Sequence, residues 1–287
     1  MPRYSVLFVL MVTVSRVLTS CSTVPAANHR LSSLLSAAEF DTLFPKRNPV
    51  YTYAGFLKAA EKFPLFLQEG TPTTQKNELA AFLANIAQET TGGWAAAPGG
   101  PLKWGLYFAE EQACIKSNCS QYNSAGRSAY VAAPGKNYYG RGAMQISYLY
   151  NYGEAGKDLG LPLIQQPELM STNATVAFET AIWFWMRAQN NKPSCHDVMC
   201  LKWKPSPADL QAKREPGFGM VINVINGGLE CGSSAGPEAR AKRNGRIAFY
   251  RYFCSQLRIS PDPHCDCTGM APYVQTENAN AEAPRKQ

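Results

Sequence analysis

The stretch Leu79-Ala80-Ala81-Phe82-Leu83-Ala84-Asn85-Ile86-Ala87-Gln88-Glu89-Thr90-Thr91-Gly92-Gly93-Trp94 carries the strongest structural signal in the chain. Its large apolar residues recur at i, i+3, i+4 and i+7 from Leu79 to Ile86, which predicts one buried helical stripe. Glu89 follows Phe82 by seven residues, so it belongs to the same stripe. The Thr-Thr-Gly-Gly segment that follows predicts the end of this helix.

Glu89 is therefore an acid in an apolar place. Burial removes water from the carboxylate, and the C-terminal end of a helix is electronegative, so both effects favour the protonated form. A carboxylic acid that keeps its proton near neutral pH suits the role of a general acid. The alternative is a structural carboxylate that pairs with a nearby base.

The composition indicates a compact globular protein with one large core or two lobes. The chain has 287 residues, of which 45% are hydrophobic and 17% charged, and it shows no internal repeat. The formal net charge is +7, but the basic residues form no stripe interleaved with aromatics. Nucleic-acid binding is therefore not expected.

The N-terminus predicts export. Arg3 precedes the apolar stretch Tyr4–Val14 and the small residues near Leu18–Ser20, a pattern typical of a signal peptide over residues 1–20. This stretch is too short to cross a membrane, and no later segment is long and apolar enough, so no membrane span is expected. Lipidation of Cys21 is an alternative. We expect a secreted, extracellular protein.

Nine cysteines fit an oxidising compartment. Because Cys21 lies in the region that would be cut or lipidated, eight remain and can pair evenly. Short separations favour the bridges Cys114–Cys119 and Cys195–Cys200. The remaining four cysteines would form two more bridges, and three connectivities are possible for Cys231, Cys254, Cys265 and Cys267. The segment His264–Cys267 could instead be half of a metal site, but no second cluster has ligand spacing. We expect no metal and no cofactor.

The pattern along the chain predicts a mainly α fold. A polar leader is expected over residues 21–35, one domain over 36–270 and a polar, disordered tail over 271–287. Helices are predicted over Ser36–Phe44, Thr52–Lys62, Asn173–Ala188, which is apolar nearly all round, and Pro237–Leu257. A long disulfide-pinned loop is predicted over 112–137. Alternating strand patterns are scarce, and a small hairpin is predicted around Met144–Tyr152.

A second carboxylate follows a cluster of aromatic residues. If this segment is helical, Trp104, Tyr107, Phe108 and Glu111 fall on one face at i, i+3, i+4 and i+7. Glu111 then shares the aromatic face, while Glu110 points away. This favours Glu111 as the working residue; the alternative is a solvated acidic pair.

The segment Tyr138–Gly153 combines five tyrosines with Gln145, Ser147 and Asn151. Flat rings beside amide and hydroxyl groups suit a sugar, although a packed tyrosine-rich turn is the alternative. Asn226 lies in the Asn- and Gly-rich segment Val221–Gly228 and is another candidate. The alternative is that this segment only caps a helix and forms a turn. Two carboxylates with aromatics and amides indicate glycoside hydrolysis. A Ser-His-Asp arrangement is poorly supported, because no nucleophile elbow accompanies His29, His196 or His264.

These motifs resemble the plant-type chitinases, glycoside hydrolase family 19. The similarity runs from about Phe40 to Cys267 and rests on several motifs in the same order, namely Glu89–Trp94, Tyr138–Gly142 with Gln145 and Ser147, Trp183–Met186, Lys192–Val198, and Pro216–Gly219 leading into Ile225–Gly228. The resemblance implies a two-lobed, lysozyme-like fold with an open cleft for β-1,4-linked N-acetylglucosamine.

The resemblance also implies a role for each site residue. Glu89 corresponds to the general acid, Glu111, 22 residues later, to the general base, and Ser147 to the serine that helps hold the attacking water. Corresponding cleft residues are Thr91, Gln145, Tyr150, Asn151 and Asn226, and Glu230 and Arg246 match charged residues networked with the catalytic pair. The family is inverting, so the carboxylates should stand about 6.5–9.5 Å apart.

Three departures from the family are visible. Gln88 replaces a residue that is often histidine, which is expected to alter local hydrogen bonding. One plant disulfide is absent, because the segment before Tyr51 lacks its cysteine and Tyr107 stands at the partner position. No cysteine-rich chitin-binding module precedes the domain, so weaker attachment to insoluble chitin is expected.

Together these features predict a secreted, monomeric endochitinase whose partners are chitin and N-acetylglucosamine oligomers. One alternative is a muralytic hydrolase that cleaves peptidoglycan, and another is a chitin-binding protein that does not cut. Asn118 and Asn173 lie in glycosylation-type triplets.

Overall fold

The structure is a computed structural model that describes Met1 and residues 27–117, 119–123, 129–189 and 191–273. Apart from Met1, the predicted signal peptide lies outside the described residues, as do Cys21, Asn118 and the predicted tail beyond Tyr273. No helix in the described ranges is long and apolar enough to cross a membrane.

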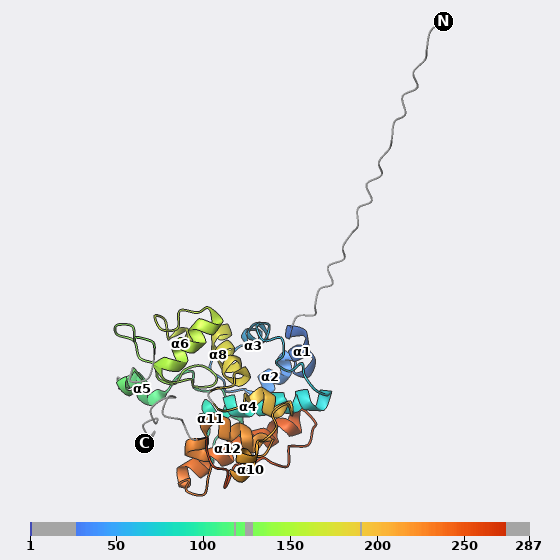
Figure 1. Cartoon of the computed structure of the whole chain (residues 1–287). Helices are drawn as coiled ribbons and strands as arrows, with labels where there is room; N and C mark the ends of the chain where they lie inside the picture. The colour runs from blue at the N-terminus through green and yellow to red at the C-terminus, as the bar shows by residue number, and fades with distance from the viewer. Residues whose placement is uncertain (2–26, 118, 124–128, 190, 274–287) are drawn as a thin grey trace.

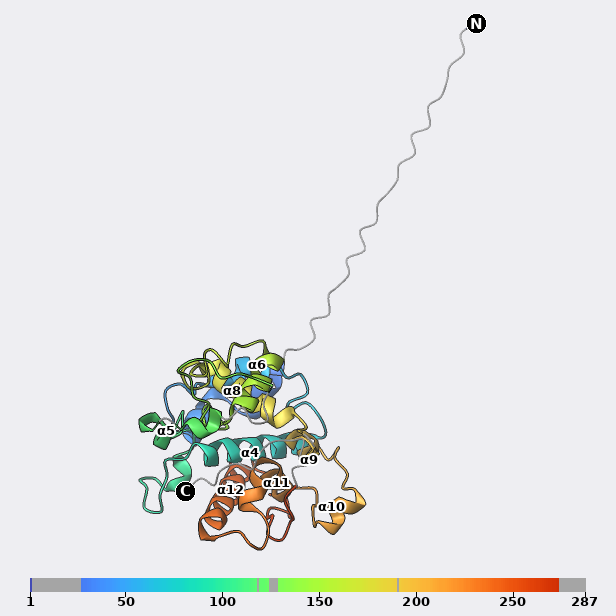
Figure 2. The ribbon, with the colours of Figure 1, turned by 60° about the vertical axis from the view of Figure 1, so that its left-hand side comes forward.

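The long helix α4, Pro72–Glu89, runs through the middle of the molecule (Figure 2). On one side of it lie α6, Leu149–Leu159, and α8, Ala174–Met186. On the other side lie α11, Phe218–Glu230, and α12, Pro237–Gln256. The fold is therefore mainly helical with two lobes, as predicted (Figure 1).

The sequence of α4 explains where this helix begins, packs and ends. The Thr71 side chain accepts a hydrogen bond from Thr74 N, and Pro72 occupies the first turn, which is a favourable helix start. The predicted apolar stripe, from Leu79 to Ile86, is completely buried. Phe82 stacks on Phe56 with ring centroids 5.7 Å apart, so α4 also anchors the aromatic core.

The other predicted helices are also present. They are α2, Ala37–Leu43, which has a capping box from Ser36; α3, Tyr53–Ala60; and α8 and α12 as given above. The remaining helical elements are short, namely α1 (Ala27–Leu34), η1 (Pro101–Lys103), α5 (Gln112–Lys116), η2 (Ser120–Asn123), α7 (Leu169–Thr172), α9 (Cys195–Met199) and α10 (Pro207–Gln211). Asn173 caps α8, since its side chain accepts from Thr175 N and Val176 N.

The ordered core extends past both predicted domain boundaries. Leu31 and Leu35 are buried, and α1 packs against α3, because the leucines of this segment recur at helical spacing. At the other end, the Arg214 guanidinium lies 3.7 Å from the centroid of the buried Tyr273 ring. Residues 31–35 and 271–273 therefore belong to the folded domain.

The predicted hairpin around Met144–Tyr152 is reduced to one antiparallel bridge between Arg141 and Ile146. Their backbones exchange hydrogen bonds of 3.2 and 3.0 Å. Gln145 and Tyr148 take positive φ angles of 48° and 77°, which interrupt an extended strand, and α6 then begins at Leu149. Among the described residues β pairing occurs only as isolated bridges.

The cysteines confirm one predicted bridge and contradict another. Cys114 is joined to Cys119, whereas Cys195 and Cys200 are free thiols at opposite ends of α9. Five positions along a helix advance the chain by about 7.5 Å along the axis, so the Cα atoms of Cys195 and Cys200 are too far apart for a disulfide. The predicted Cys195–Cys200 bridge is therefore wrong.

Of the four C-terminal cysteines, only one pair is bridged. Cys231 is joined to Cys267, while Cys254 and Cys265 are buried free thiols, so the expectation of two bridges here is also wrong. Because Cys267 is oxidised, the segment His264–Cys267 lacks the second thiolate that a metal half-site would need.

Candidate active site

Glu89 is the last residue of α4, and the residue after it fixes this helix end. Thr90 Oγ1 donates to Ile86 O at 2.6 Å and accepts from Leu106 N at 2.8 Å. Thr90 O accepts from the backbone N–H groups of Tyr107 and Phe108 at 3.1 and 2.9 Å. The end of α4 is therefore held against the aromatic segment that leads to the second carboxylate.

Arg246 of α12 connects Glu89 to Glu230 of α11. Its Nη2 atom lies 2.5 Å from Glu89 Oε1 and 2.8 Å from Glu230 Oε1, and its Nε atom lies 2.8 Å from Glu230 Oε2. Asn226 Nδ2 donates to Glu230 Oε1 at 2.7 Å. The structure thus brings together Glu89, Asn226, Glu230 and Arg246 in one network, in which Glu230 and Arg246 are buried and Glu89 and Asn226 are partly buried.

Asn85 is a member of this network that the sequence argument missed. Arg246 Nη1 donates to Asn85 Oδ1 at 2.9 Å, and Asn85 is completely buried. Asn85 lies one helical turn before Glu89 on the same stripe. An amide four residues before the acid, on the same side of the helix, was the sequence signal for Asn85.

The ionisation of the network follows from its burial and its charges. Burial by itself lowers the pKa of Arg246, but the carboxylates of Glu89 and Glu230 outweigh this and hold that pKa above its usual value. Burial raises the pKa of Glu230, but Arg246 and Asn226 outweigh it, so the net pKa is lowered. The network therefore contains a guanidinium cation and a Glu230 anion, which balance each other beside Glu89.

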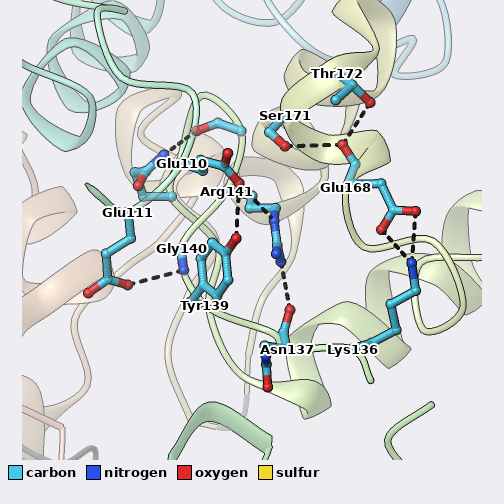
Figure 3. Close-up of polar contacts among 12 residues, drawn as sticks. Glu110, Glu111, Lys136, Asn137, Tyr139, Gly140, Arg141, Glu168, Ser171 and Thr172 are labelled. Atoms are coloured by element: carbon cyan, nitrogen blue, oxygen red, sulfur yellow. Dashed lines mark hydrogen bonds and ion pairs between the residues drawn. The ribbon is translucent and has the colours of Figure 1, made fainter. Parts of the chain in front are cut away.

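Glu111 is held by groups from two other segments, of which Figure 3 shows the contact with Gly140. Its Oε2 atom accepts from Gly140 N at 3.2 Å, and its Oε1 atom accepts from the Tyr122 hydroxyl at 3.1 Å. The backbone Glu111 N also donates to Gly140 O at 2.8 Å. Burial and the Glu111 carboxylate raise the pKa of Tyr122, so its hydroxyl stays protonated and donates.

Glu110 faces a different part of the protein (Figure 3). Its Oε2 atom lies 3.2 Å from the Tyr139 hydroxyl and 3.4 Å from Arg141 Nε. Tyr139 and Arg141 line a hollow of about 470 Å³ together with Lys136 and Glu168. The two neighbouring acids therefore point apart, as predicted.

The predicted reason for this divergence was wrong. Beyond η1 the segment from Trp104 to Glu110 is not helical, and Glu111 has the extended backbone of a helix cap. Successive side chains of an extended backbone point to opposite sides. Glu110 and Glu111 consequently separate without any helical face.

Gly140 lets several predicted site residues gather around Glu111. A methyl group at Gly140 would lie 3.4 Å from Glu111 Oε2 and 3.1 Å from Gln145 Oε1. Ser147 Oγ donates to Gln145 O at 3.1 Å, and Asn151 Nδ2 donates to Ser147 O at 2.8 Å. Gln145, Ser147 and Asn151 are therefore joined by hydrogen bonds, and this group meets Glu111 at Gly140.

Thr91 and Tyr150 are not joined to either carboxylate. Among the described residues neither of them hydrogen-bonds to Glu89 or Glu111; instead, Thr91 Oγ1 accepts from Gly93 N at 3.0 Å and shapes the turn after α4. Tyr150 lies in the first turn of α6 and is half-buried. Thr91 is adjacent to the Glu89 helix end, and Tyr150 is adjacent to Asn151.

The two carboxylate segments are neighbours through the backbone. Phe108 N lies 2.9 Å from Thr90 O, and Glu111 follows Phe108 by three residues, which span at most about 11 Å.

Gln88, the departure from the family motif, faces α12 on the other side. A methyl group at Gly245 would lie 2.1 Å from Gln88 Oε1, so the missing side chain makes room for this amide.

Exposed aromatic rings follow the end of α4. The ring centroids of Trp94 and Trp104 are 5.2 Å apart, and those of Trp104 and Tyr107 are 5.1 Å apart. Trp94 is 53% exposed and Tyr107 is 38% exposed. The sequence argument used this cluster only to orient Glu111 and did not identify it as exposed aromatic surface that follows the end of α4.

Glu89 lies at the end of α4, and Glu111 accepts a hydrogen bond from the Gly140 amide. Two separately held carboxylates with exposed aromatic rings in the same region fit a glycoside hydrolase. The chain belongs to the class I chitinases of glycoside hydrolase family 19, because residues 31–267 match that family's model. The protein is thus a glycoside hydrolase, as the motifs indicated.

The chain is similar in sequence to several plant endochitinases. The chain is 42% identical to the basic endochitinase of Vitis vinifera over 262 residues, which cover 89% of this chain and 81% of that protein. It is 47% identical to endochitinase 3 of Nicotiana tabacum over 244 residues, which cover 83% and 70%.

Solved structures support the same fold. A bacterial family 19 chitinase matches with a TM-score of 0.64 and 33% identity over 82% of this chain and 100% of that one. The class IV chitinase of Zea mays matches with a TM-score of 0.62 and 31% identity, covering 83% and 100%. The predicted lysozyme-like architecture is confirmed.

Proposed function

We propose that this protein is a secreted endochitinase that hydrolyses internal β-1,4 linkages between N-acetylglucosamine units of chitin in one inverting displacement. The observation that carries the proposal is the separate anchoring of two carboxylates. Glu89 is held by Arg246, and Glu111 is held by Gly140 and Tyr122. The relatives named endochitinases support the substrate.

Glu89 is the proposed general acid. It donates its proton to the glycosidic oxygen as the bond to the anomeric carbon breaks. The carboxylate that remains lies beside the Arg246 guanidinium, which stabilises the charge that develops. Glu230 keeps Arg246 in place and balances its charge before the proton leaves.

Glu111 is the proposed general base. It removes a proton from a water molecule as the water attacks the anomeric carbon from the opposite face of the sugar. The Gly140 amide and the Tyr122 hydroxyl fix the orientation of this carboxylate. Ser147 helps to hold the water, and a gap of about 6.5–9.5 Å between the two carboxyl groups would admit it.

The substrate is expected to lie along the residues that surround these two acids. Thr91, Gln145, Tyr150, Asn151 and Asn226 supply hydroxyl and amide groups for the sugars. The exposed faces of Trp94 and Tyr107 offer apolar surface for the C–H faces of the rings. In this scheme Glu89 gives the proton and Glu111 receives one from water, and both side chains belong to the same chain.

The decisive experiment follows the anomeric form of the sugars released from a chitin hexamer. We expect α-anomers from internal cleavage, because a single displacement inverts the β linkage. Glu89→Gln should lower kcat by at least about 1,000-fold with the fold retained, whereas Glu238→Gln, at an exposed position on α12, should act normally. Initial β-anomers would contradict inversion. Faster release from bacterial walls than from chitin, or binding without turnover, would contradict the substrate or the activity.

A further inference from the structure

A second cluster of reactive side chains lies away from the two carboxylates. Glu78 of α4 meets His196 and Cys200, which lie in and directly after α9. Glu78 is completely buried, His196 is 2% exposed and Cys200 is half-buried. Each offers one ligand atom, and the three atoms lie within 4.8 Å of one another. We propose that these residues bind Zn²⁺ or a similar thiophilic divalent cation.

The helices bring the three ligands together. His196 and Cys200 are four residues apart at the end of α9, so they share one face. Helix α9 packs against one end of α4 (Figure 2). Glu78 precedes Glu89 by eleven residues on α4, which places the two about 16 Å apart along the helix axis. The cluster is therefore separate from the proposed catalytic acid.

The distances between the ligand atoms approach those of a tetrahedral zinc site. Cys200 Sγ lies 3.6 Å from His196 Nδ1 and 3.6 Å from Glu78 Oε2. Typical Zn–S, Zn–N and Zn–O bond lengths place sulfur about 3.6 Å from nitrogen and oxygen ligands at tetrahedral angles. His196 Nδ1 lies 2.7 Å from the other carboxylate oxygen, Glu78 Oε1. A metal that replaces the shared proton must therefore either open this edge by about 0.7 Å or turn the carboxylate, so that a single Glu78 oxygen faces both His196 and Cys200.

The surroundings orient the ligands as they do in known zinc sites. His196 Nε2 lies 2.6 Å from Glu69 Oε2, on the side of the ring that faces away from Cys200, and Lys202 holds Glu69 at 2.9 Å. Carboxylate–histidine–metal triads have this arrangement. Trp185 Nε1 and Leu67 N each donate to one oxygen of Glu78, which leaves further lone pairs for a metal.

Charge is conserved when the metal enters. Both ring nitrogens of His196 face carboxylate oxygens, so without metal the ring carries two protons and the thiol of Cys200 carries one. Binding of M²⁺ releases the Nδ1 proton and the thiol proton, so two positive charges replace two others. Glu69 is 28% exposed, which gives solvent access to the edge of the cluster.

Cobalt is the probe that tests this site, because its spectrum reports thiolate ligands. The chelator-treated full-length protein should bind one equivalent of Co²⁺ and show an intense near-ultraviolet thiolate-to-cobalt band, which Zn²⁺ then removes by displacement. Cys200→Ser should lose the band and bind Co²⁺ at least about 100-fold more weakly, and Glu69→Gln about 10–100-fold more weakly. Zn²⁺ should raise the thermal midpoint of the wild type by about 5 °C or more.

The matched control is Cys265→Ser, which removes a second free thiol next to His264 and leaves Cys200 in place. This variant should keep the cobalt band. Wild-type protein that binds no cobalt, a band that persists in folded Cys200→Ser, or a band lost in folded Cys265→Ser would each overturn the assignment. Circular dichroism establishes that each variant is folded, and none of these measurements depends on chitin hydrolysis.

Discussion

The Nη2 atom of Arg246 lies 2.5 Å from Glu89 Oε1, and the same guanidinium contacts both oxygens of Glu230. A residue of α12 therefore joins the end of α4 to the end of α11. Because Arg246 is only 2% exposed, its position is set by the packing of these three helices. The orientation of the proposed acid is thus a property of the whole lobe.

Replacement of Arg246 by lysine should separate charge from geometry. Arg246→Lys keeps a cation but cannot contact Glu89, Glu230 and Asn85 at once, because an ammonium lacks the planar fork. We expect kcat for chitin oligomers to fall by at least about tenfold while KM changes little. Arg251→Lys, at an exposed position on the same helix, is the control and should leave kcat unchanged. A KM effect alone would contradict the assigned role.

The buried carboxylate of Glu230 should contribute to acid sensitivity. Arg246 and Asn226 lower its pKa in the folded state despite burial, so its ionised form stabilises the fold above the unfolded pKa of about 4.3. This stability is lost as the pH falls from there through the lower folded pKa. Glu230→Gln should unfold about 3 kcal/mol more easily at pH 7 and lose less stability between pH 5 and 3. Urea titrations at each pH measure both effects, and parallel curves for the two proteins would exclude this role.

The adjacent acids Glu110 and Glu111 provide a matched pair of variants. Glu111→Gln should lower kcat by at least about 100-fold, because the proposed base is lost while the Gly140 contact can persist. Glu110→Gln should keep kcat within about threefold. It should lower the free energy of unfolding by about 1 kcal/mol, because Glu110 accepts hydrogen bonds from Tyr139 and Arg141. Initial rates on a chitin hexamer compare them. Equal losses would show that the two acids are not functionally distinct.

Two glycines of α11 should respond in opposite directions. A methyl group at Gly219 would lie 2.4 Å from the backbone oxygen of Asp266, so Gly219→Ala should lower the free energy of unfolding by about 1–3 kcal/mol. Nothing lies within 4 Å of a methyl group at Gly228, so Gly228→Ala should be neutral or stabilise by up to about 1 kcal/mol. Denaturant unfolding of the two variants gives the comparison. Similar free energies of unfolding for the two variants would mean that the backbone at Asp266 can move away from Gly219 at little cost.

The sequence was sufficient to predict features that depend on local periodicity. The stripe from Leu79 to Ile86, the helix end at Glu89 and the start of α12 at Pro237 all follow from spacing and capping. The same logic applied to residues 27–35 would have predicted α1, because Leu31 and Leu35 are four residues apart.

Features that depend on contacts distant in sequence were less predictable. Asn85 joins the Arg246 network only because α12 packs on α4, and the Gly140 amide reaches Glu111 from 29 residues away. Spacing suggested a Cys195–Cys200 bridge, but the intervening helix separates the thiols and turns Cys200 toward Glu78. Positive φ angles at Gln145 and Tyr148 likewise arise from the packing of this turn and replaced the expected hairpin.

The disulfide between Cys231 and Cys267 begins one residue after Glu230. It joins the end of α11 to the C-terminal segment, which also contacts that helix through the Gly219 N to His264 O and Asn223 Nδ2 to Ala271 O hydrogen bonds. A protease that nicked the backbone between Leu257 and His264 would therefore leave two fragments joined through sulfur. Such a nicked enzyme would separate into its fragments only after reduction, and until then the C-terminal segment would stay tethered to the residue that follows Glu230.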